Sequence, residues 1–232
     1  MKRFAFGLSV GILTYGCISP RCDTVPRATY EAVSQSFLML AREDVKDGKS
    51  MWNKGSGVAV AEEGGRHFIY TAKHVLFDKE NGGALPTRLY AMRITGETIE
   101  INLSDIEVSE LSHDAVRIAV SSPVCPELRL ANHPPRYGEQ LFFFGDANGA
   151  GVMCAEAGKV VAVGPLEFEH TADIMRGMSG GPVVDSECRL VGLCQKGRQT
   201  TARKNGVELQ GDSRYLKLRR FGVILDNIKW RK

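Results

Sequence analysis

The sequence predicts an all-β protein, and three observations support this fold class. From Gly55 onward, short runs rich in β-branched and aromatic residues alternate with turn residues. Helix signals are confined to the two ends of the chain. Residues 121–135 hold four of the nine prolines and little strand pattern, which is typical of a connector between two halves. We therefore expect two small β-barrels, at residues 51–130 and 131–232, after an extension at residues 20–50.

The expected elements follow in order. Residues 28–40 could form a short helix, although residues 36–40 fit a first buried strand equally well. Apolar runs at residues 57–61 and 67–72 flank the turn Glu62-Glu63-Gly64-Gly65, which predicts a β-hairpin. A short C-terminal helix is expected within residues 221–230. Further candidate strands are residues 88–94, 97–103, 115–120, 140–144, 159–163, 182–184 and 190–194.

Composition and charge limit the function classes. The 232 residues are 43% apolar and 25% charged, the usage of a soluble globular protein rather than of a disordered chain or a multi-span membrane protein. The net charge of +3 is small, and no basic stripe with interleaved aromatic residues occurs. The sequence therefore does not predict nucleic-acid binding.

The N-terminus resembles an export signal. Lys2 and Arg3 precede an uncharged apolar run at residues 4–15, which is too short to span a membrane comfortably. We predict a signal peptide or lipoprotein signal at residues 1–19 and an exported protein: periplasmic, secreted or membrane-anchored. Gly16 before Cys17 fits lipidation of that cysteine in part; ordinary cleavage nearby and an uncleaved anchor are the alternatives.

Export would permit disulfide bonds. The six cysteines allow 15 pairings, so the sequence does not choose among them, and lipidation of Cys17 would leave an odd thiol. No pair has metal-ligand spacing, and no metal site is expected. The cysteines are Cys17, Cys22, Cys125, Cys154, Cys188 and Cys194.

The segment Gly177-Met178-Ser179-Gly180-Gly181-Pro182 is the strongest functional signal, because it surrounds a serine with glycines before an apolar strand. Glycines permit backbone conformations that aim N–H groups at one point, as an oxyanion hole requires. We expect Gly177 and Ser179 to supply those donors and Ser179 to be a nucleophile. Taken alone, the segment fits a glycine-rich β-turn equally well.

A nucleophilic serine needs a histidine base, and all five histidines precede Ser179. The Gly-x-Ser-x-Gly elbow of α/β-hydrolases requires a histidine after the serine, so that interpretation fails. His74 stands where a buried strand ends, and Asp114 heads the apolar run 115–120. Each alone fits a structural role; together they fit a base and the carboxylate that orients it.

Four segments in this order resemble the motifs of trypsin/chymotrypsin-like serine proteases: Gly55-Ser56-Gly57-Val58, residues 71–75 with His74, Asp114-Ala115-Val116 and residues 177–182. The simple bacterial and viral branches and the high-temperature-requirement proteases are the most similar. The resemblance implies two six-stranded antiparallel β-barrels with His74, Asp114 and Ser179 between them. It implies a serine endopeptidase that forms an acyl-enzyme and needs no cofactor.

The resemblance also implies where a protein or peptide substrate binds. It would pair as an added strand with residues 193–197, which include Gln195 and Gly197. Asp173, six positions before Ser179, stands where trypsin-like members bind a lysine or arginine side chain. An apolar pocket, with Arg176 neutralising Asp173, is the alternative. Cys188 or Cys194 could form a disulfide with Cys154.

Two other functions remain open at this stage. A protease fold that has lost catalysis could act as a binding module, although all three catalytic positions are filled here. An esterase could use the same residues on a different acyl group.

Overall fold

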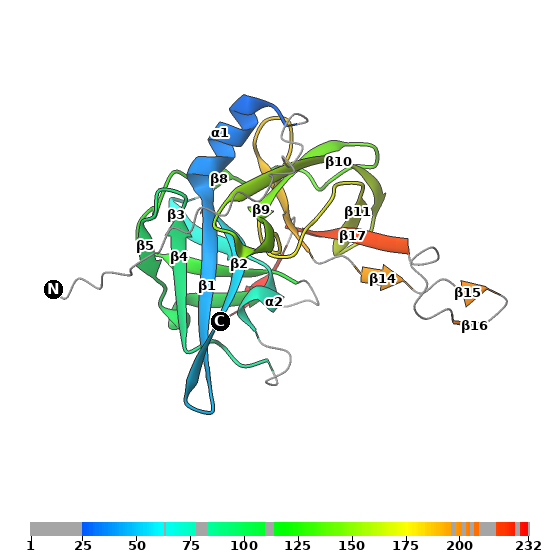
Figure 1. Ribbon diagram of the computed structural model, residues 1–232. Helices are drawn as coiled ribbons and strands as arrows, with labels where there is room; N and C mark the ends of the chain where they lie inside the picture. Colours follow the sequence, from blue (N-terminus) through cyan, green and yellow to red (C-terminus); the bar gives the residue numbers. More distant parts are fainter. Residues whose placement is uncertain are drawn as a thin grey trace, which may run out of the picture.

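The computed structural model describes residues 25–62, 64–77, 83–109, 114–195, 198–200, 203–204, 207–208, 217–225 and 228–231. It is mostly β, with two large sheets and few helices (Figure 1). The expected signal at residues 1–19, with Cys17, lies outside this part of the chain and stays a prediction. Neither α-helix of the described ranges has the length and apolar character needed to cross a membrane.

The first sheet contains nine strands in the order β18-β6-β7-β3-β2-β1-β4-β5, with β8 beside β2. The predicted hairpin at Glu62–Gly65 is confirmed, because β2 and β3 pair antiparallel on either side of it. The strands are β1 (Phe37–Lys46), β2 (Lys49–Glu62), β3 (Arg66–Thr71), β4 (Arg88–Arg93), β5 (Thr98–Glu100), β6 (Ile106–Ser109), β7 (Val116–Val120), β8 (Leu128–Arg129) and β18 (Trp230–Arg231).

Both expectations for the N-terminal segment are correct in part. Helix α1 (Arg27–Ser36) ends where the backbone of Phe37 becomes extended, and β1 follows at once. Phe37, Leu38 and Leu40 are almost completely buried, so packing on both faces of the sheet favours a strand there. Strand β1 pairs with β2 and β4, so part of the predicted extension, residues 37–46, belongs to the first sheet.

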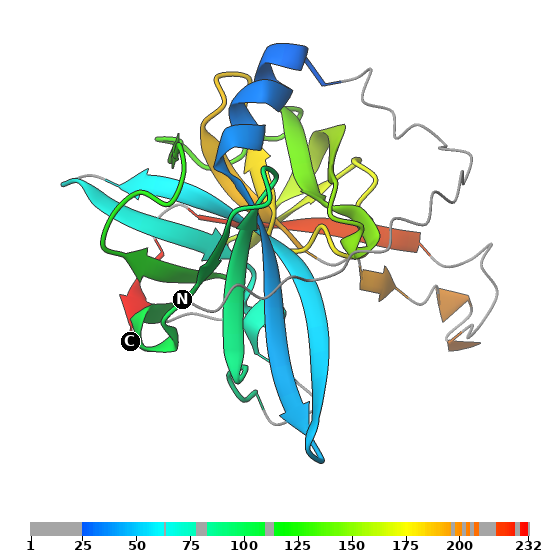
Figure 2. The ribbon, with the colours of Figure 1, turned by 60° about the vertical axis from the view of Figure 1, so that its left-hand side comes forward.

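The second sheet closes into a six-stranded barrel, because its first strand, β11, pairs with β17 (Figure 2). Closure leaves these strands without free edges. The barrel consists of β9 (Gln140–Asp146), β10 (Met153–Val163), β11 (Glu167–His170), β12 (Pro182–Val184), β13 (Leu190–Cys194) and β17 (Lys217–Ile224). Strand β14 (Arg198–Thr200) extends this sheet, while β15 (Arg203–Lys204) and β16 (Val207–Glu208) form a separate pair.

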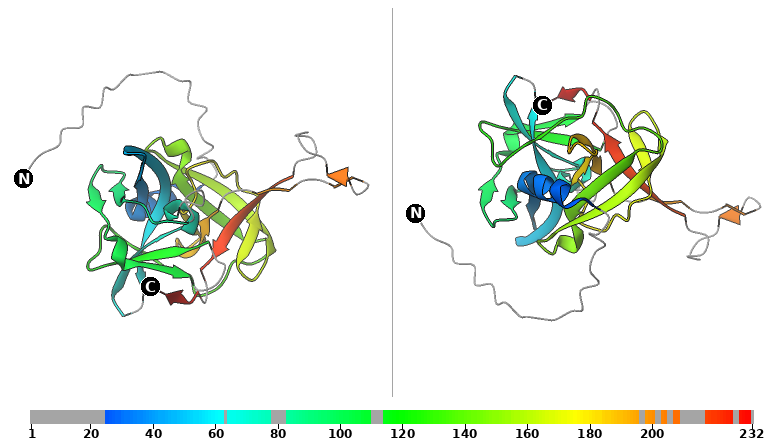
Figure 3. Two further views of the ribbon diagram at one scale, coloured as in Figure 1. Left: turned by 90° about the horizontal axis from the view of Figure 1, so that it is seen from below. Right: turned by 90° about the horizontal axis from the view of Figure 1, so that it is seen from above.

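The predicted C-terminal helix is wrong. Strand β17 runs to Ile224, and Trp230–Arg231 form β18, which pairs with β6 of the first sheet. The end of the chain therefore returns to the first half of the molecule (Figure 3). The Trp230 ring packs edge-on against Tyr70 at 5.4 Å, and this burial favours the strand over the local helix preference.

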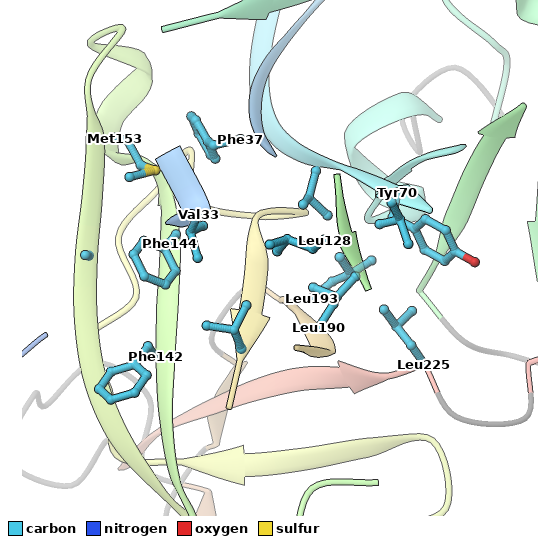
Figure 4. Close-up of a cluster of buried hydrophobic side chains, with 14 of the residues drawn as sticks. Val33, Phe37, Tyr70, Leu128, Phe142, Phe144, Met153, Leu190, Leu193 and Leu225 are labelled. Carbon is cyan, nitrogen blue, oxygen red and sulfur yellow. The ribbon is translucent and has the colours of Figure 1, made fainter. Parts of the chain in front are cut away.

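One apolar cluster joins the two halves (Figure 4). It contains Val33, Phe37 and Tyr70 from the N-terminal half and Phe144 and Leu193 from the closed barrel, and each is at most 1% exposed. The halves therefore share apolar surface, so burial of these side chains stabilises their relative position.

Candidate active site

His74 lies in the short helix α2 (Lys73–Leu76), which begins two residues after β3 ends. Its Nδ1 lies 2.5 Å from Oδ2 of Asp114, and its backbone N–H donates to Oδ1 of the same carboxylate at 2.9 Å. Two contacts to one carboxylate fix both the main chain and the ring of His74. With Nδ1 bonded to an ionised carboxylate, the proton of the neutral ring is on Nδ1, and Nε2 is left as an acceptor.

Asp114 lies two residues before β7 and is held by three hydrogen-bonding groups, on Lys73, His74 and Gln195. Its carbonyl accepts from Lys73 N–H at 3.2 Å, and the Gln195 amide donates to Oδ2 at 3.1 Å. Burial alone raises the pKa of Asp114, but hydrogen bonds and charge from His74, with the Gln195 bond, hold that pKa below its ordinary value. The carboxylate is therefore ionised at neutral pH and can stabilise a protonated His74.

Ser179 lies in the loop between β11 and β12, whose path depends on glycines. Gly177 and Gly180 have φ values of 92° and 81°, which other residues rarely adopt. A Cβ at Gly177 would lie 2.2 Å from the carbonyl oxygen of Asp146, and one at Gly180 would lie 2.3 Å from Oγ1 of Thr71. Both the backbone angle and the close approach therefore require glycine.

The first sheet fixes this loop through Ser56 of β2, a completely buried residue. Its N–H donates to the Ser179 carbonyl at 2.9 Å, and its hydroxyl donates to the Gly177 carbonyl at 2.8 Å. The same hydroxyl accepts from Asp146 N–H at 2.9 Å. Sequence reasoning used Ser56 only as part of a motif and assigned it no role. A serine between two glycines inside a buried strand was the available signal.

Two N–H groups beside Ser179 are not used within the described chain. The N–H groups of Met178, Gly180 and Gly181 all donate to backbone carbonyls at 2.8–3.2 Å. Those of Gly177 and Ser179 pair with no acceptor among the described residues. Unpaired N–H groups are costly when they cannot reach water, so their place next to a cleft indicates that they bind a ligand oxygen or water.

His74 and Ser179 line one cleft of about 540 Å³. Its walls come from the β1–β2 hairpin, from α2 and from the loop of residues 174–179. The structure thus brings together His74, Asp114 and Ser179, which are 40 and 65 positions apart along the chain.

The three residues predicted to bind substrate, Asp173, Gln195 and Gly197, do not all lie in this cleft. Asp173 is exposed and is not among the residues lining this cleft, so its role in binding a basic side chain stays a prediction. Gln195 is buried and directs its amide at Asp114, a contact that sequence reasoning did not foresee. Gly197 lies outside the described residues.

The predicted disulfide between Cys154 and either Cys188 or Cys194 is wrong. No disulfide joins the four cysteines of the described ranges, and Cys194 donates its thiol to the Phe144 carbonyl at 3.6 Å. Complete burial raises the pKa of the Cys194 thiol to about 12. Cys17 and Cys22 fall outside this part of the chain.

Comparison with known proteins agrees with this geometry. The family described as "Trypsin-like peptidase domain" matches residues 55–193, which include all three residues of the site. No curated protein matches the chain in sequence.

Several solved protease structures share the fold at low sequence identity. The active form of the Rv3671c protease from M. tuberculosis is 17% identical, with a TM-score of 0.60 over 89% of this chain and 83% of that one. The serine endoprotease from Yersinia pestis is 20% identical (TM-score 0.58; 86% and 63% covered). The HtrA-type protease AlgW, solved with a tripeptide, is 18% identical (0.59; 85% and 58%).

Proposed function

The chain belongs to the trypsin-like peptidase family and is a serine endopeptidase, and from this premise we propose that Ser179, His74 and Asp114 form its catalytic triad. The triad would work in a cleft between two β-barrels, the closed barrel of residues 140–224 and a second one built from the first sheet. Protein or peptide chains are the substrates.

One observation carries this proposal: the first sheet presents a carboxylate-bound imidazole to the same cleft as a serine from the closed barrel. The Asp114 contact to Nδ1 leaves Nε2 of His74 to accept a proton. A serine hydroxyl is a weak nucleophile near neutral pH, so a base placed in this way is what activates it.

The reaction is acyl transfer in two halves. Ser179 Oγ attacks the peptide carbonyl carbon while Nε2 of His74 takes the hydroxyl proton, giving a tetrahedral intermediate. The intermediate collapses, the C–N bond breaks, and His74 returns the proton to the leaving amine. Water then attacks the Ser179 ester with His74 again as base, which releases the acid and restores the serine.

The N–H groups of Gly177 and Ser179 support the assignment of an oxyanion hole. Each is unpaired within the described chain; one belongs to the nucleophile itself, and the other lies two residues before it. Donors fixed before the reaction stabilise the charge that develops on the carbonyl oxygen, and removal of one such donor typically lowers kcat by about 100- to 1,000-fold.

Fluorophosphonate labelling followed by cleavage of a peptide library tests the proposal. We expect the wild type to be labelled and to cut internal peptide bonds, and we expect Ser179→Ala and His74→Ala to lose both activities. Ser186→Ala, at an exposed serine in the turn after β12, is the matched control and should be labelled normally.

The outcomes separate the alternatives. Labelling without cleavage of any peptide, but with turnover of simple esters, would favour the esterase interpretation. A folded wild type that is not labelled would contradict the triad and favour a binding module.

We also propose that the protein is exported, as the signal-like residues 1–19 suggest. Mass spectrometry of the N-terminus after expression in cells should find cleavage before residue 25. An intact cytoplasmic N-terminus would contradict export.

A further inference from the structure

The walls of the catalytic cleft carry an excess of positive charge. Three lining side chains are cationic, namely Arg42, Lys54 and Arg176, and no carboxylate lines the cleft among the described residues. The following inference rests on the proposed function, because it concerns which substrates that cleft accepts.

Arg42 does not contribute to this excess. Its Nε lies 3.0 Å from Oδ2 of Asp44, its Nη1 donates to the Val75 carbonyl at 3.3 Å, and its side chain is only 10% exposed. Asp44 therefore balances its charge, and Arg42 holds β1 against α2.

Lys54 and Arg176 differ from Arg42, because no carboxylate of the described chain pairs with either. The Lys54 ammonium donates to a neutral acceptor, the Gly149 carbonyl, at 3.0 Å. The Arg176 side chain is exposed, and its guanidinium makes no hydrogen bond or ion pair within the described ranges. Two positive charges therefore remain unbalanced at the cleft.

Lys54 and Arg176 line the same cleft as Ser179, and both residues contact one turn of the chain. Lys54 contacts the short helix η3 (Ala147–Gly149) through Gly149, and the Arg176 carbonyl accepts from Asn148 of the same turn at 2.5 Å. Arg176 also directly precedes Gly177, whose N–H is assigned to the oxyanion hole. An anionic group that entered the cleft would therefore face two unbalanced cations in its walls.

The position of the cleft indicates which part of the substrate meets them. The acyl part of a substrate is expected to pair along residues 193–197, but no residue of β13 lines the cleft. The cleft is formed instead by the β1–β2 hairpin, by α2 and by the loop that carries Ser179. Its occupant is therefore the part of the substrate beyond the scissile bond, which leaves with the amine.

We infer that the protease selects substrates with an acidic side chain on the leaving-group side of the scissile bond, recognised by Lys54 and Arg176. Clefts lined by one sign of charge attract the opposite charge and raise its local concentration. Complementary charges also suppress the wrong partner, because like charges repel at close range. Both effects would favour binding of a glutamate or aspartate side chain and would disfavour binding of a lysine.

Matched peptides test this inference. They share one sequence and differ only in carrying glutamate, glutamine or lysine at each of the first three positions after the scissile bond. For the wild type, kcat/KM should be about 10-fold or more higher for glutamate than for lysine at one of these positions, with glutamine between them. The ratio should fall as salt rises, because these side chains are solvent-exposed.

Charge variants identify the source of the selectivity. Lys54→Gln and Arg176→Gln should each reduce the ratio of glutamate to lysine, and Lys54→Glu combined with Arg176→Glu should reverse it. Arg129→Gln, at an exposed arginine in β8 outside the cleft, is the control and should keep the wild-type ratio. Equal rates for the three peptides, or a preference that survives in the double variant, would overturn the inference.

Binding to Ser179→Ala distinguishes a failure of this inference from a failure of the proposed function. Calorimetry should show tighter binding of the glutamate peptide than of the lysine peptide. Selective binding without turnover by the wild type would support the charge assignment while contradicting the triad. Turnover with no preference in rate or binding would contradict the charge assignment and leave the triad supported.

Discussion

The two sheets contribute to the site in different ways. The first sheet supplies His74 and Asp114, which are held by hydrogen bonds between side chains and to one backbone N–H. The closed barrel supplies Ser179 on a loop whose shape depends on backbone angles and close approaches that only glycine permits. A substitution in the first sheet can therefore remove one hydrogen bond and leave the others in place. In the Ser179 loop, any added side-chain atom at these glycines forces the backbone to move.

The interiors of the two sheets differ as well. The first sheet encloses the guanidinium of Arg117, which lies within 2.8 Å of Glu62 and Glu107 and packs on the rings of Phe68 and Trp230. The closed barrel is filled largely by apolar and aromatic side chains, and the rings of Phe143, Phe168 and His170 pack against one another. The half that holds the proposed catalytic pair of His74 and Asp114 thus also contains a buried ion-pair network.

The largest effect should come from breaking the side-chain pair in the first sheet. Asp114→Asn keeps the size of the side chain but cannot hold His74 in the tautomer with Nδ1–H, so we expect kcat to fall about 10,000-fold. Circular dichroism should show a native fold. A loss below about 10-fold would show that Asp114 does not orient the base.

A methyl group at Gly180 tests the Ser179 loop, whose shape depends on its glycines. Gly180→Ala would place a Cβ 2.3 Å from Thr71 and 2.4 Å from the Ser56 carbonyl oxygen, so the loop must move and activity should fall about 1,000-fold. Gly96 has a similar φ of 89° but no atom within 4 Å of its would-be Cβ. Gly96→Ala is therefore the control; it should cost about 1 kcal/mol of stability and no activity. Equal activity of the two variants would contradict the packing argument.

Removing the buried cation of the first sheet should affect stability rather than chemistry. Arg117→Met removes the cation shared by Glu62 and Glu107, so that, among the described residues, Glu107 loses its partner while Glu62 keeps only Arg66 and the Tyr70 hydroxyl. We expect a loss of about 3 kcal/mol in the free energy of unfolding. Denaturant unfolding measures the loss, and kcat of the remaining folded protein should be unchanged. A stability loss below about 1 kcal/mol would show that solvent and Arg66, not Arg117, balance these carboxylates.

The contact between the two halves should have an intermediate effect on rate. Ser56→Ala removes the hydroxyl that joins Asp146 N–H to the Gly177 carbonyl, which leaves two buried groups unpaired. We expect kcat to fall about 10- to 100-fold with little change in KM, because the N–H of Gly177, the proposed oxyanion donor, is less well fixed. Thr71→Val, which removes the hydroxyl bonded to the Ser56 carbonyl, should cost less. A wild-type kcat for Ser56→Ala would contradict this role.

The smallest effect is on the pH dependence of stability. Because the folded pKa of Asp114 is lowered, its ionised form stabilises the fold above the ordinary aspartate pKa, and this contribution is lost as pH falls below about 4. Asp114→Asn lacks the contribution. Urea unfolding at pH 6 and pH 3 should therefore show a stability gap between wild type and variant that narrows at pH 3. A gap that widens would contradict the sign of the shift.

Much of this arrangement could be predicted from local patterns. Alternating apolar runs and turn residues identified the β class and the β2–β3 hairpin, because these signals lie within a few residues of each other. The order of the motifs around His74, Asp114 and Ser179 identified the candidate triad, which the structure brings together.

The remaining features depend on contacts that no local pattern contains. Residues 230–231 form a strand because the Trp230 ring packs against Tyr70 and the guanidinium of Arg117. Both partners lie more than 100 positions earlier in the chain. The amide of Gln195 reaches Asp114 across 81 positions, and the hydroxyl of Ser56 reaches Gly177 across 121. The sequence allowed a disulfide from Cys154 to Cys188 or Cys194, but burial and a carbonyl partner account for Cys194 without one.

The central claim is that groups from both sheets act as one catalytic unit. The most direct test is kcat/KM for the wild type, Ser179→Ala, His74→Ala and the double variant on one peptide. Residues that act together are strongly non-additive, so the double variant should be no slower than the slower single variant. Losses that multiply in the double variant would show that Ser179 and His74 act independently, and would contradict the account.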